Sequence, residues 1–120
     1  MELVIGGAFQ GKLAYATKKY GLKAADICEC SVNKEPDFSK KCIYRFERYV
    51  LWCMRNGRDP VTSFEDDKVI IMDDIFCGVV PVEPETRAWR EASGRTMAAI
   101  AQNADTVTRL FCGIPKRIKG

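Results

Sequence analysis

The chain has 120 residues and a mass of 13.5 kDa, close to the usual size of one domain, so we expect a single domain over residues 1–120. Hydrophobic residues at 47% and charged residues at 29% are typical of a globular protein, which excludes disorder, collagen-like repeats and low-complexity arrays. The formal net charge of +3 is too mild for binding to nucleic acid through its phosphates, so no nucleic-acid partner is expected.

Six cysteines and the absence of histidine limit the chemistry of these 120 residues. No Cys-x-x-Cys pair occurs, so the usual zinc-site spacings are missing. Nucleophiles activated by histidine, and phosphohistidine or guanylylhistidine intermediates, need an imidazole and are excluded. Apolar neighbours predict that four of the cysteines are buried thiols: Cys28, Cys42, Cys53 and Cys112.

Residues 1–16 lack the basic start and the long apolar run of a secretory signal peptide. No apolar run approaches the length of about 18 residues that a membrane-spanning helix needs. We therefore expect a cytoplasmic protein with reduced thiols and without a membrane partner.

The first twenty residues predict a strand, a loop and a helix. Residues 3–5 form an apolar run closed by two glycines, which is typical of a buried strand that ends in a tight loop. Residues 12–20 have a helical pattern, and Gly21 is placed to end that helix.

The next forty residues predict one strand and one amphipathic helix. Residues 25–30 form the strand, and a polar turn follows them. From Phe38 onward apolar residues recur every three or four positions, and Asn56 and Gly57 end the run. This pattern predicts a helix that begins near Phe38.

The second half of the chain completes an alternation of strands and helices. Residues 69–72 are the most strand-like segment, and their uninterrupted apolar run indicates a strand covered on both faces. Residues 84–103 predict a helix, residues 107–112 a last strand, and residues 113–115 a turn that leads the tail back along the sheet edge. The fold class is therefore α/β: a three-layer sandwich with a mostly parallel sheet of about four or five strands flanked by helices.

A glycine-rich loop joins the first predicted strand to the first predicted helix. It has the spacing G-x-x-x-x-G-K and consists of Gly6, Gly7, Ala8, Phe9, Gln10, Gly11 and Lys12. Such a loop holds phosphates with main-chain N–H groups and a helix N-terminus, while its lysine reaches the outer phosphates. The motif predicts a fold like that of the P-loop NTPases and a nucleotide, GTP or ATP, as the bound cofactor.

The position after the lysine departs from this pattern. A working loop of this type carries Ser or Thr there, and the hydroxyl coordinates Mg²⁺. Leu13 occupies the position here, so it would line the phosphate site without holding the metal. Any Mg²⁺ would need other ligands or water. The main-chain N–H groups could still bind phosphate, but the motif alone does not predict catalysis.

Carboxylates follow two of the predicted strands. Asp73 and Asp74 come directly after residues 69–72, where the strand ends of a parallel sheet face the ligand crevice. Because neighbouring residues of a strand point to opposite faces, we expect at most one of these two to serve a metal or substrate. Glu29, near the end of the second predicted strand, is the rival candidate. Each acid is equally compatible with a strand-end residue that faces water.

Several short motifs follow one another in the rest of the chain. They are Asp-Ile-Phe-Cys-Gly-Val-Val-Pro at 74–81, Arg-Glu-Ala-Ser-Gly-Arg at 90–95, Ala-Asp at 104–105, and Gly-Ile-Pro-Lys-Arg-Ile-Lys at 113–119. Together with the glycine loop and the pair Glu29-Cys30, this order resembles the adenosylcobinamide kinase / adenosylcobinamide-phosphate guanylyltransferase family. The matching order spans roughly two thirds of the chain.

The resemblance implies a cytoplasmic enzyme of cobalamin biosynthesis that assembles as a trimer. Such proteins phosphorylate a hydroxyl of adenosylcobinamide with a nucleoside triphosphate and Mg²⁺, and then attach GMP through a guanylylated histidine. Carried over by position, the loop glycines and Lys12 would hold phosphates. Glu29 would assist the metal or the hydroxyl, and Asp74 would stand where the family has Glu. Lys12, Asp74 and Glu29 are thus the candidate catalytic residues, and Glu29 and Asp74 the candidate metal ligands.

The chain also departs from the family pattern. The guanylylated histidine has no counterpart, and family members are roughly half again as long, so the region between the first helix and Glu29 looks deleted. Guanylyl transfer by the family route is therefore not available to these residues. Other family residues are replaced by Phe9, Gln10, Leu13, Asp73, Phe76 and Met97.

The sequence thus predicts a shortened, diverged member of this family that binds nucleotide and retains, at most, kinase activity toward a corrinoid or a related alcohol. The alternative is a non-catalytic, regulatory module with the same fold that binds nucleotide, a corrinoid or a protein partner. A third possibility is that the resemblance reflects ancestry alone and that the protein has an unrelated function at its surface.

Overall fold

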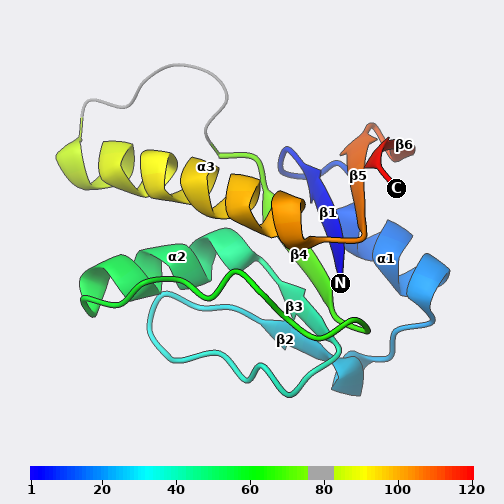
Figure 1. The fold of residues 1–120 in the computed structure, drawn as a ribbon, viewed down its shortest axis with the longest axis horizontal. Coiled ribbons are helices and arrows are strands. Elements are labelled where there is room, and N and C mark those ends of the chain that lie inside the picture. The colour runs from blue at the N-terminus through cyan, green and yellow to red at the C-terminus, as the bar shows by residue number, and fades with distance from the viewer. Residues whose placement is uncertain (76–82) are drawn as a thin grey trace.

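A computed structural model describes residues 1–75 and 83–120 and contains one six-stranded sheet (Figure 1). The strand order is β2-β3-β4-β1-β5-β6, and only the pair β5 and β6 is antiparallel. The α/β class and the mostly parallel sheet confirm the fold predicted from the sequence, but the sheet has six strands where about four or five were expected. The strands are β1 (Glu2–Gly6), β2 (Ile27–Glu29), β3 (Cys42–Tyr44), β4 (Val69–Asp73), β5 (Thr106–Phe111) and β6 (Ile114–Lys119).

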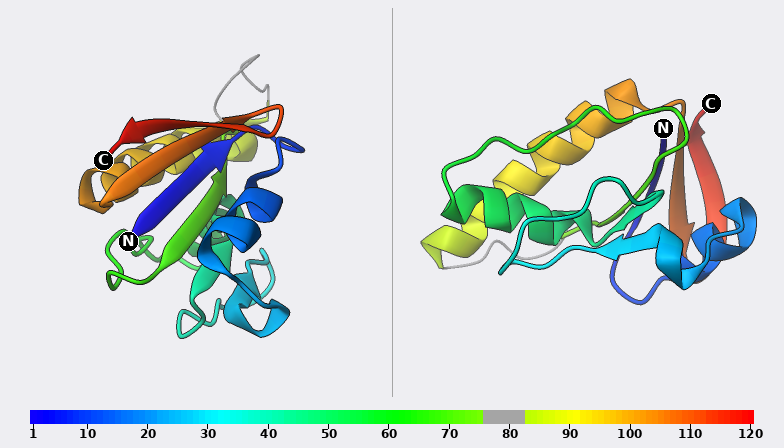
Figure 2. Two further views of the ribbon diagram at one scale, coloured as in Figure 1. Left: turned by 90° about the vertical axis from the view of Figure 1, so that its right-hand side faces the viewer. Right: turned by 90° about the horizontal axis from the view of Figure 1, so that it is seen from below.

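Helices cover both faces of this sheet, as Figures 1 and 2 show. Helix α1 (Lys12–Tyr20) lies on one face, while α2 (Phe46–Arg55) and α3 (Pro84–Asn103) lie side by side on the other. A single 3₁₀ turn, Ala24–Asp26, leads into β2. In the described part of the chain, no helix is both long enough and apolar enough to cross a membrane.

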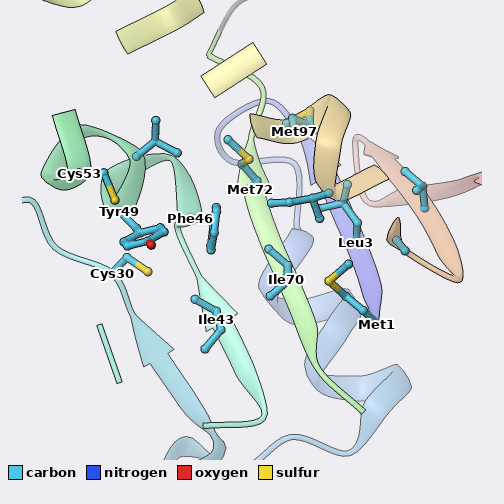
Figure 3. Packing of buried hydrophobic residues seen from close by; sticks show 14 of the residues in the cluster. Met1, Leu3, Cys30, Ile43, Phe46, Tyr49, Cys53, Ile70, Met72 and Met97 are labelled. Carbon is cyan, nitrogen blue, oxygen red and sulfur yellow. The ribbon is translucent and has the colours of Figure 1, made fainter. Parts of the chain in front are cut away.

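Alternation along the central strands builds the two halves of the core. Leu3 and Ile70 are fully buried toward α2 and α3, together with Met97 and Ile100 of α3 (Figure 3). Their strand neighbours, such as Val4, belong to a second buried cluster under α1. Because successive strand residues point to opposite faces, this two-sided burial is what a central parallel strand requires.

The strongest local signals predicted their elements well. The bounds of α1 and α3 agree with the expected residues 12–20 and 84–103. Gly21 ends α1 with φ 62° and donates its N–H to the Thr17 carbonyl, a position where glycine carries no steric penalty. The C-terminal tail returns along β5 as the antiparallel strand β6.

The prediction of a helix from Phe38 is wrong in its first half. Residues 42–44 are strand β3, which pairs in parallel with both β2 and β4. Cys42 and Ile43 are completely buried in the sheet, and Arg45 then takes a left-handed conformation, φ 59°, before α2 begins at Phe46. Burial between two strands outweighs the helical spacing of the apolar residues, because propensity is weaker than tertiary packing.

Two expectations for the cysteines and the second strand also need correction. Strand β2 has only three residues, since the 3₁₀ turn takes the first part of the expected segment 25–30. Cys112 is exposed and Cys28 is half-buried, whereas both were expected to be buried. Cys42 and Cys53 are buried as predicted, and burial raises the pKa of the Cys42 thiol to about 12.

Candidate functional site

The glycine loop connects β1 to α1 at the end of the sheet where the parallel strands terminate. Gly6 has φ 153° at its start, and Gly11 has φ 85° as the N-cap of α1. The first turn of α1 contains no acidic residue, so the partial positive charge of the helix N-terminus is not neutralised there. Phe9, at the tip, is fully exposed with φ 61°.

The turn between β5 and β6 is hydrogen-bonded to this loop. The main-chain N–H of Cys112 donates to the side-chain oxygen of Gln10, and the N–H of Gly113 donates to the main-chain oxygen of Gln10 at 3.1 Å. A Cβ atom at Gly6 would stand 2.6 Å from the carbonyl oxygen of Leu110 in β5, so β1 and β5 meet closely at this point. The loop therefore contacts β5 at Gly6 and the turn between β5 and β6 at Gln10.

Lys12 and Asp73 form an ion pair beneath the loop. The Lys12 Nζ atom lies 2.7 Å from Asp73 Oδ1 and also donates to the Gly7 carbonyl oxygen at 2.6 Å. The Lys12 side chain is buried and that of Asp73 is 22% exposed. The register of β1 and β4 places Asp73 directly beside Gly6, which explains why this acid meets the lysine.

A cavity of about 230 Å³ opens beside this ion pair. Its wall combines the loop and the start of α1 with the ends of β3 and β4, so it contains two cations, one carboxylate and the N-terminus of a helix. Such a set can bind an anion of phosphate size. The lining residues are Ala8, Phe9, Gly11, Lys12, Leu13, Ala14, Tyr44, Arg45 and Asp73.

A buried carboxylate on α2 holds the end of β4 in place. The Glu47 Oε1 atom accepts the main-chain N–H of Asp73 at 2.9 Å, and the Trp89 indole of α3 donates to the Glu47 carbonyl oxygen at 2.7 Å. Glu47 is only 3% exposed, and its pKa is raised first by this burial and also by the nearby Asp73 charge. Sequence reasoning missed Glu47 because it placed this residue in the middle of a longer helix.

Replacing Glu47 by glutamine is expected to stabilise the protein at neutral pH. An acid whose folded-state pKa is raised contributes stability below its ordinary value of 4.5 and loses it as pH rises through the folded-state pKa. Glutamine keeps an oxygen for the Asp73 N–H without the buried charge, so we expect a gain on the order of 1 kcal/mol near pH 7.5. Urea unfolding at pH 4 and pH 7.5 measures this, and an equal difference at both pH values would contradict it.

The other two predicted carboxylates lie in different places. The Asp74 carboxylate pairs with Arg109 of β5 at 3.2 Å and lines a cavity of about 180 Å³ on the far side of the loop. Glu29, at the end of β2, lines a cavity of about 420 Å³ formed with residues 27, 28, 31, 34–37 and 40. Lys12, Asp74 and Glu29 thus line three different cavities, and the acid that pairs with the lysine is Asp73. No three Cys, Asp or Glu residues in the described ranges could together hold a metal ion.

Arg45 is a second residue of the site that the sequence did not reveal. It is the N-cap residue of α2, directly after β3, and it lines the Lys12 cavity. Its guanidinium carbon lies 5.2 Å from the centre of the Tyr44 ring. The sequence gives little indication of this role, because one left-handed residue between a three-residue strand and a helix produces no periodic pattern of apolar residues.

Comparison with known proteins agrees with the C-terminal motifs. The sequence model of one family, described as cobinamide kinase / cobinamide phosphate guanyltransferase, matches residues 46–118, which is more than half of the 120 residues. This chain belongs to that family. The activities named for the cobinamide kinase family serve cobalamin biosynthesis, and both consume a nucleotide. No curated protein matches the chain.

The cobinamide kinase match covers the elements from α2 to most of β6. It therefore includes Glu47 and Asp73, whereas the glycine loop, Glu29 and Arg45 precede it. Residues 76–82, which carry most of the Asp-Ile-Phe-Cys-Gly-Val-Val-Pro motif, lie outside the described residues. Of the residues that line the Lys12 cavity, Asp73 lies within the matched range and the others precede it.

Proposed function

We propose that this member of the cobinamide kinase family binds the phosphates of GTP or ATP in the cavity beside Lys12. The observation that carries the proposal is the buried lysine at the start of α1, which lines the cavity while its Nζ atom is held by the Gly7 carbonyl oxygen and Asp73. The main-chain N–H groups of the loop and of the first turn of α1 would surround the outer phosphates. Lys12 would add a charge-assisted bond while it remains close to Asp73.

The residues present do not fit a Mg²⁺ ion held by the protein. Leu13 supplies no hydroxyl, and one oxygen of Asp73 is taken by Lys12. Glu29 and Asp74, the candidate metal ligands, line other cavities. The binding proposal therefore uses the amides and cations of the chain and does not pass through the metal.

Replacing Lys12 by methionine tests the proposal. Methionine keeps the apolar stem but removes the charge, so we expect affinity for GTP and ATP to fall about 100-fold in calorimetry, the order of a lost charged contact. The matched control is Lys18→Ala, an exposed lysine of the same helix, which should bind as the wild type does. Equal affinity in the Lys12 variant, or no binding by the wild type, would refute the site.

Phosphoryl transfer is a second candidate function, favoured by the position of Asp73. Its carboxylate stands at the end of β4 beside Lys12, where it could accept the proton of an alcohol while the γ-phosphoryl group passes to the alcohol oxygen and the nucleoside diphosphate leaves. The acceptor would be the cobinamide hydroxyl or a related corrinoid alcohol. These 120 residues contain no histidine, so they lack the nucleophile that would accept GMP in the guanylyl transfer of the family.

One assay separates the enzyme from a binding module. Transfer of labelled phosphate from GTP or ATP to cobinamide should occur in the wild type and vanish in the Lys12 variant if the chain is a kinase. Tight nucleotide binding without transfer would assign the non-catalytic role. Corrinoid binding, a cytoplasmic location and assembly as a homotrimer are further parts of this proposal, suggested by the family alone.

A further inference from the structure

The Lys12 cavity contains a second cation whose role the loop motif does not explain. Arg45 follows the end of β3 directly and lines the cavity together with the start of α1. None of the ion pairs found in the described part of the chain includes Arg45, and its Nε atom is buried with no hydrogen-bond partner among the described residues. The Arg45 side chain as a whole is only partly buried, and it lines the cavity without a carboxylate partner in the ion pairs above.

Neighbouring groups hold the guanidinium in place without neutralising it. The Tyr44 ring supports it from one side at 5.2 Å. The pKa of Arg45 is raised, first by a hydrogen bond with Tyr44 and then by charges that include Glu29 and Asp73. Arg45 itself lines only the Lys12 cavity, and Glu29 lines the neighbouring cavity of residues near β2.

We infer that Arg45 binds the phosphates of the nucleotide and supplies the positive charge that Mg²⁺ would otherwise provide. This inference rests on the proposed phosphate site. Lys12 and Arg45 together exceed the single carboxylate of Asp73 in that cavity, so the site has a net positive charge before a ligand arrives. A guanidinium presents several N–H donors in one plane and can bind two phosphate oxygens at once.

This arrangement makes nucleotide binding independent of the metal. With Leu13 after the lysine, the loop offers no side-chain ligand to Mg²⁺, and the ion would compete with Arg45 for the same phosphate oxygens. We therefore expect free GTP, ATP and inorganic triphosphate to bind at least as tightly in EDTA as in excess Mg²⁺. A loop that depends on the metal would show the opposite order.

The test is calorimetry of the full chain with GTP, ATP and inorganic triphosphate, in EDTA and in Mg²⁺. In EDTA, Arg45→Asn should bind each ligand about 10- to 100-fold more weakly than the wild type, the loss expected for one charged contact. Asparagine tolerates the left-handed backbone at this position, so the variant should fold. The matched control is Arg58→Asn, because Arg58 stacks on Trp52 at 5.1 Å in the same manner but lines neither the Lys12 cavity nor its loop.

The outcomes distinguish this inference from the proposal on which it rests. If the wild type binds triphosphate only with Mg²⁺, or if Arg45→Asn binds normally in EDTA, the role of Arg45 is overturned and the phosphate site stands. If the wild type binds no triphosphate in either condition, the proposed function fails first. Should Arg45→Asn not fold, Arg45→Lys keeps the charge without the planar donors and should lose about 3- to 10-fold in EDTA; unchanged affinity would again overturn the inference.

Discussion

Replacing Gly6 by alanine should lower the free energy of unfolding by about 3 kcal/mol or more. Two costs combine at this position. The backbone has φ 153°, which residues with a side chain rarely adopt, and the new Cβ atom would stand 2.6 Å from the Leu110 carbonyl oxygen. That oxygen belongs to the main chain of β5, so it cannot move away without shifting the strand. Urea denaturation with both proteins at one pH measures the loss.

Gly7→Ala is the matched control for this change. A Cβ atom there would meet only the Cγ atom of Gln10, at 3.8 Å, and the residue does not need a positive φ. We expect its unfolding free energy to stay within about 1 kcal/mol of the wild type. A Gly6 variant as stable as the Gly7 variant would show that β1 and β5 do not approach closely beneath the loop.

The elements that could be predicted are those with strong local signals. Gly21 and Pro84 mark a helix end and a helix start by backbone chemistry that depends on no distant contact. The apolar run at 69–72 likewise indicated a strand buried on both faces, and β4 is buried along its length up to Asp73. Hydrophobic pattern and stop signals together were enough for the α/β class.

Strand β3, Arg45 and Glu47 were missed in the sequence prediction for one shared reason. Strand β3 has three residues, too few to show an alternation, and its apolar residues continue the spacing of α2. Because the expected helix absorbed this strand, Arg45 and Glu47 were not seen as residues at a strand end. The pairing of β3 with β4 brings Arg45 to the Lys12 cavity and Glu47 to the main chain of Asp73.

The choice between the two adjacent aspartates also depended on the tertiary structure. Alternation along a strand predicted that at most one of them would serve the site, but it could not tell which one lies near Lys12. The register of β1 against β4 decides it, since Gly6 pairs with Asp73 and the main-chain N–H of Asp74 donates to the Gly6 carbonyl oxygen at 2.8 Å. Asp73 therefore faces Lys12, and Asp74 turns to Arg109.

Replacing Phe46 by alanine is expected to cost about 3 to 5 kcal/mol of unfolding free energy, a large part of the stability of a small domain. Phe46 is completely buried at the start of α2, with its ring centre 4.9 Å from that of Tyr49 and 5.9 Å from that of Phe64. Phe111, which is 72% exposed on β5, is the matched control, and Phe111→Ala should change stability by less than about 0.5 kcal/mol in the same urea titration.

Phe46→Ala should also weaken ligand binding, because the buried ring anchors residues 45–47 beside the proposed phosphate site. Phe46 stands between Arg45, which lines the Lys12 cavity, and Glu47, which binds the Asp73 main chain. A cavity under this turn would let both neighbours move, and positioned charges lose affinity when their support loosens. GTP affinity, measured where the variant is still folded, should fall by at least about tenfold while Phe111→Ala binds normally. Unchanged affinity in a destabilised Phe46 variant would show that α2 does not position the phosphate site.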